Sequence, residues 1–135
     1  MMNKLIWIVL VVFLLAACKD AETIEQSTVN RWTQVIEGNY QEAYDYLSPA
    51  YREVESLNAY MLRLETAKLK VKWVAAKFLS KDCSEDACTI KVDLEYKYTF
   101  PQRAMGEIQL STEVIENWIK LDGRWYLVPS DKQLL

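Results

Sequence analysis

Few residue types in this chain are able to do chemistry, because the sequence contains no histidine and only three cysteines. Histidine is the usual proton-transfer group near neutral pH and the commonest metal ligand. Its absence excludes Ser-His-Asp and Cys-His catalytic arrangements and the usual zinc sites. Chemistry by a carboxylate, a tyrosine, a lysine or a cysteine thiol remains possible. We expect no cofactor and no metal.

The first cysteine, Cys18, follows an apolar segment at the start of the chain. Residues 1–4 carry one lysine, residues 5–15 (LIWIVLVVFLL) are apolar without interruption, and two alanines precede the cysteine. This order is typical of a secretory signal peptide. The alternative is a single membrane-spanning helix, which needs about 20 apolar residues, whereas this run ends before Lys19. We therefore predict that residues 1–17 are a cleaved signal peptide.

The four residues Leu15–Cys18 (LAAC) resemble the lipobox of bacterial lipoproteins. The resemblance implies a diacylglyceryl group on the Cys18 sulfur, cleavage just before this residue and acylation of the new amino terminus. Lipid of this kind anchors a protein stably, so it implies a periplasm-facing location in the cell envelope, with residues 18–21 as the lipidated N-terminus and 22–135 as one domain. Lys19 rather than aspartate follows the cysteine, which favours the outer membrane over the inner one. The alternative is an incidental thiol near a cleavage site.

The other two cysteines, Cys83 and Cys88, enclose the four residues SEDA between two predicted strands. In an exported protein, two thiols that flank a tight loop indicate a disulfide. A redox-active pair usually has two intervening residues rather than four, and a metal site would need further ligands. We predict a structural disulfide, with free thiols as the alternative.

Carboxylates and aromatic residues are the remaining candidates for a site. Asp45 lies between Tyr44 and Tyr46, so it is the candidate catalytic acid or base, with a solvated helical carboxylate as the alternative. Eight tyrosines and five tryptophans exceed what the packing of a small domain requires, and tyrosine suits half-wet cavities and contact surfaces. Core and rim packing is the alternative for these aromatic residues. The predicted lining of an aromatic cavity is Tyr44, Tyr60, Trp73, Tyr96 and Trp118.

These candidate residues must be positioned by helices that precede strands. Apolar residues at helical spacing predict helices within 21–37, 40–48 and 56–66, the first ended by Gly38. In the third helix the expected buried residues are Leu57, Tyr60, Met61 and Leu64. From residue 68 the apolar period changes to two, which predicts strands over 68–79, 89–100, 108–121 and 124–128. Within 108–121 the alternation slips between Val114 and Ile115, which predicts a β-bulge.

Helices followed by a meander of about four antiparallel strands form an α+β domain. Two phrases, VIEGNYQEAYDYLSPAYRE (35–53) and WIKLDGRWYLV (118–128), resemble the nuclear transport factor two-like superfamily, also called SnoaL-like or cystatin-like cones. The resemblance implies a cone fold, with N-terminal helices packed on a curved antiparallel sheet. Because this superfamily includes enzymes, binding modules and assembly subunits, it does not choose a function.

The charge pattern favours binding over catalysis. The formal net charge of −3 provides no electrostatic footprint for nucleic acid. In the predicted strand 89–100, Asp93 and Glu95 lie on the charged face, and no acidic residue interrupts the apolar face. We therefore expect a lipid-anchored, non-enzymatic envelope module that presents an aromatic cavity or a sheet face to a protein partner or a small apolar ligand. The alternative is a periplasmic isomerase-like or hydrolase-like enzyme that uses Asp45 or a tyrosine as acid or base.

Overall fold

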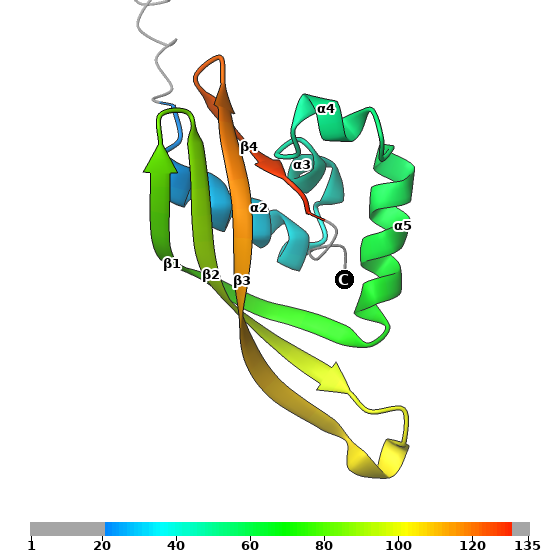
Figure 1. Ribbon diagram of the computed structural model, residues 1–135. Coiled ribbons are helices and arrows are strands. Elements are labelled where there is room, and N and C mark those ends of the chain that lie inside the picture. Colours follow the sequence, from blue (N-terminus) through cyan, green and yellow to red (C-terminus); the bar gives the residue numbers. More distant parts are fainter. Residues whose placement is uncertain (1–20, 131–135) are drawn as a thin grey trace, which may run out of the picture.

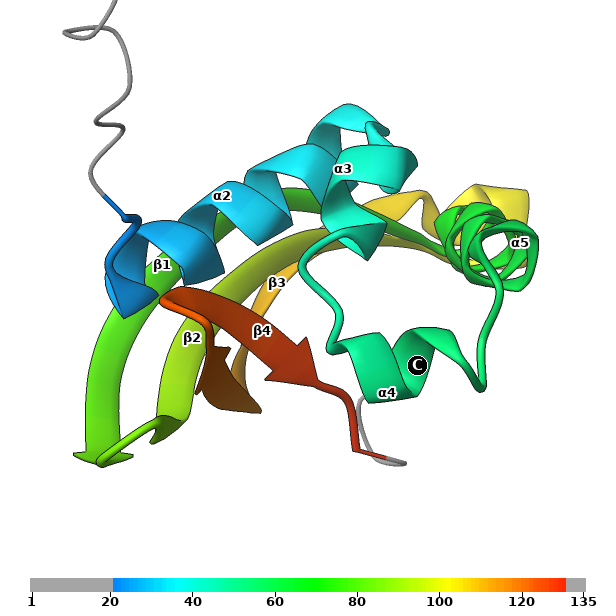
Figure 2. The same cartoon turned by 90° about the horizontal axis from the view of Figure 1, so that it is seen from above.

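The computed structural model describes residues 21–130, so the predicted signal peptide and Cys18 lie outside the described residues. The described elements are α2 (Ile24–Glu37), α3 (Tyr40–Tyr44), α4 (Pro49–Arg52), α5 (Leu57–Lys68), β1 (Val71–Ser84), β2 (Ala87–Thr99), the 3-10 turn η2 (Arg103–Met105), β3 (Glu107–Leu121) and β4 (Arg124–Val128). The helices come first and pack on one antiparallel sheet with the order β1-β2-β3-β4 (Figure 1). Figure 2 shows that the long strands are strongly curved. The α+β class and the layout of helices on a four-stranded antiparallel sheet are confirmed.

Helix α2 begins and ends where the local chemistry of its ends dictates. Thr23 Oγ1 accepts a hydrogen bond from the Gln26 backbone N–H, and the Gln26 side chain accepts one from the Thr23 backbone N–H. This reciprocal arrangement satisfies two amides that the helix leaves unpaired. Gly38 ends the helix with a φ of 82°, in the left-handed region that favours glycine. The inward face carries Trp32 and also Arg31, which is only 8% exposed although it is charged.

Helix α5 departs from the prediction at one position. Tyr60 and Leu64 are buried, and Leu57 packs against the core from its edge. Met61 is 39% exposed, so its assignment to the buried stripe was wrong. Successive helical residues are rotated by about 100°, and the line through Tyr60 and Leu64 that faces the core leaves Met61 on the outer side.

The alternation predicted for the second strand is confirmed in β2 as far as Leu94, after which four successive residues are half-buried. Its inward residues Cys88, Ile90, Val92 and Leu94 are all buried. Its outward lysines form cross-strand ion pairs with glutamates of β3, Lys91 with Glu113 at 3.1 Å and Lys97 with Glu107 at 3.4 Å. One face of the sheet is therefore packed and the other is solvated, as in many antiparallel sheets.

The predicted bulge between Val114 and Ile115 is wrong. Strands β2 and β3 pair in one unbroken register, and the register shifts occur in β1 instead, after Trp73 and after Phe78. Because no residue of β3 is skipped, Ile115 lies on the outer face, where it is 51% exposed. Its neighbour Glu116 lies on the inner face and is 1% exposed. A carboxylate therefore belongs to the core of this domain.

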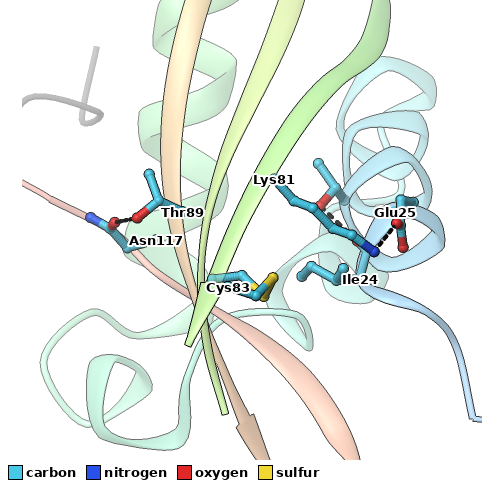
Figure 3. The surroundings of a disulfide bond; sticks show 8 residues. Ile24, Glu25, Lys81, Cys83, Thr89 and Asn117 are labelled. Carbon is cyan, nitrogen blue, oxygen red and sulfur yellow. Dashed lines mark hydrogen bonds and ion pairs between the residues drawn. A yellow bond between two sulfur atoms is a disulfide. The ribbon is translucent and has the colours of Figure 1, made fainter. Parts of the chain in front are cut away.

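Cys83 and Cys88 form the predicted disulfide, which closes the β1–β2 hairpin (Figure 3). The two residues are direct partners in the ladder, with Cα atoms 4.1 Å apart. Near this end of the hairpin, Lys81 of β1 donates a hydrogen bond to Glu25 of α2 (Figure 3). This bond is the main cause of the lowered pKa of the Glu25 carboxyl. The first helix is thus fixed to the edge strand beside a covalently closed turn.

Candidate functional site

A cavity of about 560 Å³ lies between α2, α5 and the inner face of the sheet. The cavity lies beside a part of β3 that β4 does not reach. Strand β4 is short, and its last residue, Val128, pairs with Asn117. The residues of β3 that precede Asn117 therefore have no β4 residue beside them. The volume lies within the range of small-molecule sites. The apolar part of the wall includes Trp32, Leu47, Leu94, Val114 and Leu127, and the polar part includes Arg31, Tyr60, Arg63 and Glu116.

The buried carboxylate of Glu116 is held by three donors from two elements. Its Oε1 accepts hydrogen bonds from Arg31 Nη1 at 3.1 Å and from Trp32 Nε1 at 2.8 Å. Its Oε2 accepts one from Trp118 Nε1 at 2.9 Å. A carboxylate is tolerated in a core only when it is paired and hydrogen-bonded, and these donors meet that requirement. Both oxygens of Glu116 are consequently engaged by the protein.

Arg31 is the cationic member of this cluster. Its guanidinium carbon lies 4.5 Å from the centroid of the Trp32 ring, within the range of a cation–π contact. Its Nη1 bonds Glu116, whereas its buried Nε has no hydrogen-bond partner among the described residues. The buried hydroxyl of Tyr60 likewise has no hydrogen-bond partner in the described part of the chain. Two residues of one cavity wall thus carry a polar group that has no partner within residues 21–130.

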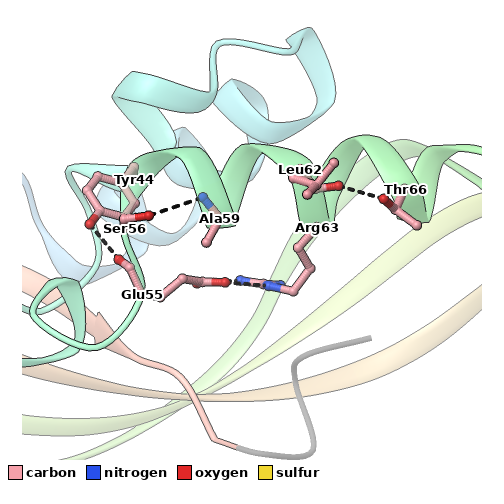
Figure 4. A network of polar contacts seen from close by, with 7 residues as sticks. All are labelled: Tyr44, Glu55, Ser56, Ala59, Leu62, Arg63 and Thr66. Carbon is pink, nitrogen blue, oxygen red and sulfur yellow. Dashed lines mark hydrogen bonds and ion pairs between the residues drawn. The ribbon is translucent and has the colours of Figure 1, made fainter.

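Arg63 differs from Arg31, because two nitrogens on one edge of its guanidinium are both hydrogen-bonded to a carboxylate. Its Nε and Nη2 donate to the two carboxylate oxygens of Glu55, each at 2.9 Å (Figure 4). The bidentate pair raises the pKa of Arg63. The Arg63 guanidinium also lies 5.3 Å from the centroid of the Tyr60 ring. Glu55 therefore fixes one edge of the cavity from the loop that precedes α5.

A second cavity of about 480 Å³ adjoins the first on the other side of Arg31, Trp32 and Arg63. The Trp32 and Trp73 rings meet edge to face in its wall, with centroids 6.3 Å apart. The two arginines and Trp32 line both cavities and so stand between them. The other apolar lining of the second cavity is Val35, Leu64, Ala67 and Val71.

The predicted aromatic residues are only partly brought together. Tyr60 lines the first cavity and Trp73 the second. Tyr44 packs against Tyr60, with ring centroids 5.5 Å apart, and its hydroxyl donates to the Glu55 carbonyl oxygen at 2.6 Å (Figure 4). Trp118 is a core residue, 1% exposed, whose indole N–H donates a hydrogen bond to Glu116. Tyr96 is half-buried in β2 and pairs with Trp73 in the ladder. Within the described residues, neither cavity is lined by Tyr44, Tyr96 or Trp118.

Asp45, the candidate acid or base, lies apart from both cavities. It follows the last turn of α3, its side chain is 45% exposed, and it forms an ion pair with Arg52 at 3.5 Å. Of the polar residues that line the cavity, Tyr60 was predicted from the sequence, whereas Arg31, Arg63 and Glu116 were not. A signal for Glu116 was present, because it occupies the inward position of a strand between Val114 and Trp118.

Residues 21–130 also lack two features, one that would indicate a metal site and one that would indicate a membrane span. No group of three or more cysteine, aspartate or glutamate side chains among these residues is arranged to hold a metal ion. No helix among the same residues combines the length and the apolar character required to cross a membrane.

No protein-family model matches the chain, and no curated protein matches it. Solved structures do match. The solution structure of a SEC-C motif containing protein from Rhodopseudomonas palustris aligns with a TM-score of 0.64 and 15% identity, over 86% of this chain and 83% of that one. The crystal structure of a SEC-C motif containing protein from Psychrobacter arcticus aligns with a TM-score of 0.63 and 12% identity. That alignment covers 87% of this chain and 65% of the other, so this chain spans slightly less than two thirds of that protein.

These matches overturn the resemblance to the nuclear transport factor two-like superfamily, because the matched structures are SEC-C motif containing proteins. The two phrases that carried the resemblance form a helix end with the short helices that follow it, and a terminal hairpin. Such phrases report local structure that many families share, so they were a poor guide to the family. The cone-fold assignment is withdrawn with the resemblance. At identities this low the likeness concerns the fold alone, and in that sense the chain is similar to SEC-C motif containing proteins.

Proposed function

We propose that this protein is a lipid-anchored binding module of the bacterial cell envelope that holds a small, mostly apolar ligand. The observation that carries the proposal is the cavity of about 560 Å³ between α2, α5 and the sheet. Its wall combines the Trp32 indole and several aliphatic side chains with polar groups from α2, α5 and β3. Small-molecule sites generally have this composition.

Binding is favoured over catalysis by the state of the carboxylates. A general base must be within hydrogen-bond reach of the proton that it removes. Both oxygens of Glu116 already accept bonds from the protein, and Asp45 lies outside the cavity. Glu113 also borders the cavity, but its carboxylate pairs with Lys91 on the outer face of the sheet.

The anchor is the second part of the proposal, and it rests on the sequence LAAC before Lys19. Ala21, the first described residue, is three positions after Cys18, which corresponds to at most about 11 Å of extended chain. The next residue, Glu22, accepts hydrogen bonds from Ser27, Asn30 and Tyr46. A lipid on Cys18 would therefore hold the domain against a membrane surface, and we favour the outer membrane.

A neutral apolar dye tests the cavity. N-phenyl-1-naphthylamine should bind the mature chain carrying Cys18→Ser with a rise in dye fluorescence. Val114→Phe, which places a larger side chain in the cavity wall, should weaken this binding at least tenfold. Ser111→Phe is the matched control, because Ser111 is an exposed residue of the same strand and should not affect the dye. Undiminished dye binding by Val114→Phe would reject the cavity as the binding site.

Metabolic labelling tests the anchor. The wild-type protein should incorporate labelled palmitate and sediment with membranes, and the Cys18→Ser protein should do neither. A mature wild-type protein that begins at another residue and stays in the aqueous fraction would contradict the anchor without touching the cavity.

A further inference from the structure

We infer that the ligand of the first cavity carries a carboxylate, which the Arg31 Nε and the Tyr60 hydroxyl receive. The inference rests on the proposed binding function of this cavity. It adds the chemical class of the ligand, a small monocarboxylic acid with an apolar body.

The first observation is the unequal use of two arginine forks. A guanidinium presents five donors in a fixed plane, and its Nε and one Nη form an edge that matches the two oxygens of a carboxylate. Arg63 uses this edge for Glu55, with both distances at 2.9 Å. Arg31 bonds Glu116 through Nη1, and its buried Nε, which belongs to the equivalent edge, has no partner among the described residues. The residue is nine-tenths buried, and buried donors of this strength are normally paired.

The second observation is the Tyr60 hydroxyl. Tyr60 is completely buried, and its hydroxyl has no hydrogen-bond partner within residues 21–130. A tyrosine hydroxyl can donate to a carboxylate oxygen. Tyr60 and Arg31 come from different helices, α5 and α2, and line the same cavity. The two residues that carry an unpaired donor thus belong to the wall of one cavity.

The charged side chains around the first cavity are paired, so the donors left for a ligand are the Arg31 Nε and the Tyr60 hydroxyl. Arg31 is balanced by Glu116 and Arg63 by Glu55. The wall of the first cavity also carries apolar side chains, among them Trp32, Leu94 and Leu127. A single carboxylate on an apolar chain fits this distribution, because its charge meets donors and its body meets indole and aliphatic groups.

The test compares octanoate with 1-octanol, which has the same apolar chain without the charge. Each should displace N-phenyl-1-naphthylamine from the Cys18→Ser chain, and octanoate should bind at least tenfold more tightly. Arg31→Lys keeps a positive charge opposite Glu116 but lacks the fork, so it should weaken octanoate about tenfold and leave 1-octanol unchanged. Tyr60→Phe removes only the hydroxyl and should weaken octanoate several-fold, which keeps the test valid if Arg31→Lys does not fold. Arg103→Lys in the exposed turn η2 is the matched control and should change neither affinity.

The possible outcomes separate this inference from the function on which it rests. If 1-octanol binds as tightly as octanoate while Val114→Phe still excludes the dye, the carboxylate is rejected and the apolar cavity stands. If the Cys18→Ser chain prefers octanoate over 1-octanol, but neither Arg31→Lys nor Tyr60→Phe alters that preference, the assigned donors are wrong. If the Cys18→Ser chain without further changes binds neither the dye nor octanoate, both the inference and the proposed function fail.

Discussion

Replacing Glu116 by glutamine tests whether the buried carboxylate stabilises this fold. The glutamine carbonyl can take the place of Oε1 and accept from Arg31 and Trp32, but its amide nitrogen then faces Trp118 Nε1, which now donates to Oε2 at 2.9 Å. One bond to a charged acceptor is lost, at about 1.5–3 kcal/mol, and buried donors are left unpaired, at about 1–3 kcal/mol. The free energy of unfolding should fall by about 3–5 kcal/mol, a large part of the stability of a small domain. The corresponding fall in Tm is about 12–20 °C.

Urea and thermal unfolding of the Cys18→Ser chain, followed by circular dichroism, measure this effect. Glu113→Gln is the matched control, because Glu113 is in the same strand and pairs with Lys91 on the solvated face, with both side chains 48% exposed. Removing such a surface pair should cost at most about 1 kcal/mol. Equal losses for Glu116→Gln and Glu113→Gln would refute the reasoning, since the buried carboxylate would then contribute no more than an exposed one.

Three further changes test the fold. Leu94→Asp should unfold the domain, because Leu94 is 5% exposed on the packed face and an unpaired buried carboxylate costs several kcal/mol; Asp93→Leu on the other face should be nearly neutral in the same melts, and equal tolerance would disprove the register. Replacing Cys83 and Cys88 by serine should lower Tm by only a few degrees, since the loop is short; a loss of folding would show a larger role. Burial, followed by the hydrogen bond to Glu22, raises the pKa of Tyr46 from 10 to about 12. Its contribution to stability is therefore full below pH 10 and lost as the pH rises through 12, and Tyr46→Phe should remove one late-titrating phenol from the absorbance titration.

The fold was predictable where the signals are local. The β2 alternation, the Gly38 helix stop and the closely spaced Cys83 and Cys88 each report structure within a few residues, and each is confirmed. The packing of helices on an antiparallel sheet follows from the order of such elements. The fate of Cys18 stays a prediction, because it lies outside the described residues.

The site was not predictable in the same way, because its central contact joins residues 85 positions apart. Arg31 alone resembles a solvated helix charge, and Glu116 alone resembles a solvated strand charge. Only their pairing, with two indole donors, offsets the cost of removing them from water. The predicted bulge was a misreading of the same fact. An apolar Ile115 faces outward and a charged Glu116 faces inward, so two exceptions to the alternation resembled a slip by one residue.

The Arg31–Glu116 pair also constrains how this sequence can change during evolution. A substitution that removes one partner leaves the other charge buried and unpaired, at about 3–5 kcal/mol, whereas replacing both with apolar residues of similar volume is often neutral or stabilising. The effect of changing Arg31 therefore depends in sign on the residue at position 116. Lineages that descend from this chain should keep both charges or neither, and single replacements should be transient. Loss of the pair would also remove the fork of Arg31, so a lineage that escapes the constraint would give up carboxylate recognition at the same step.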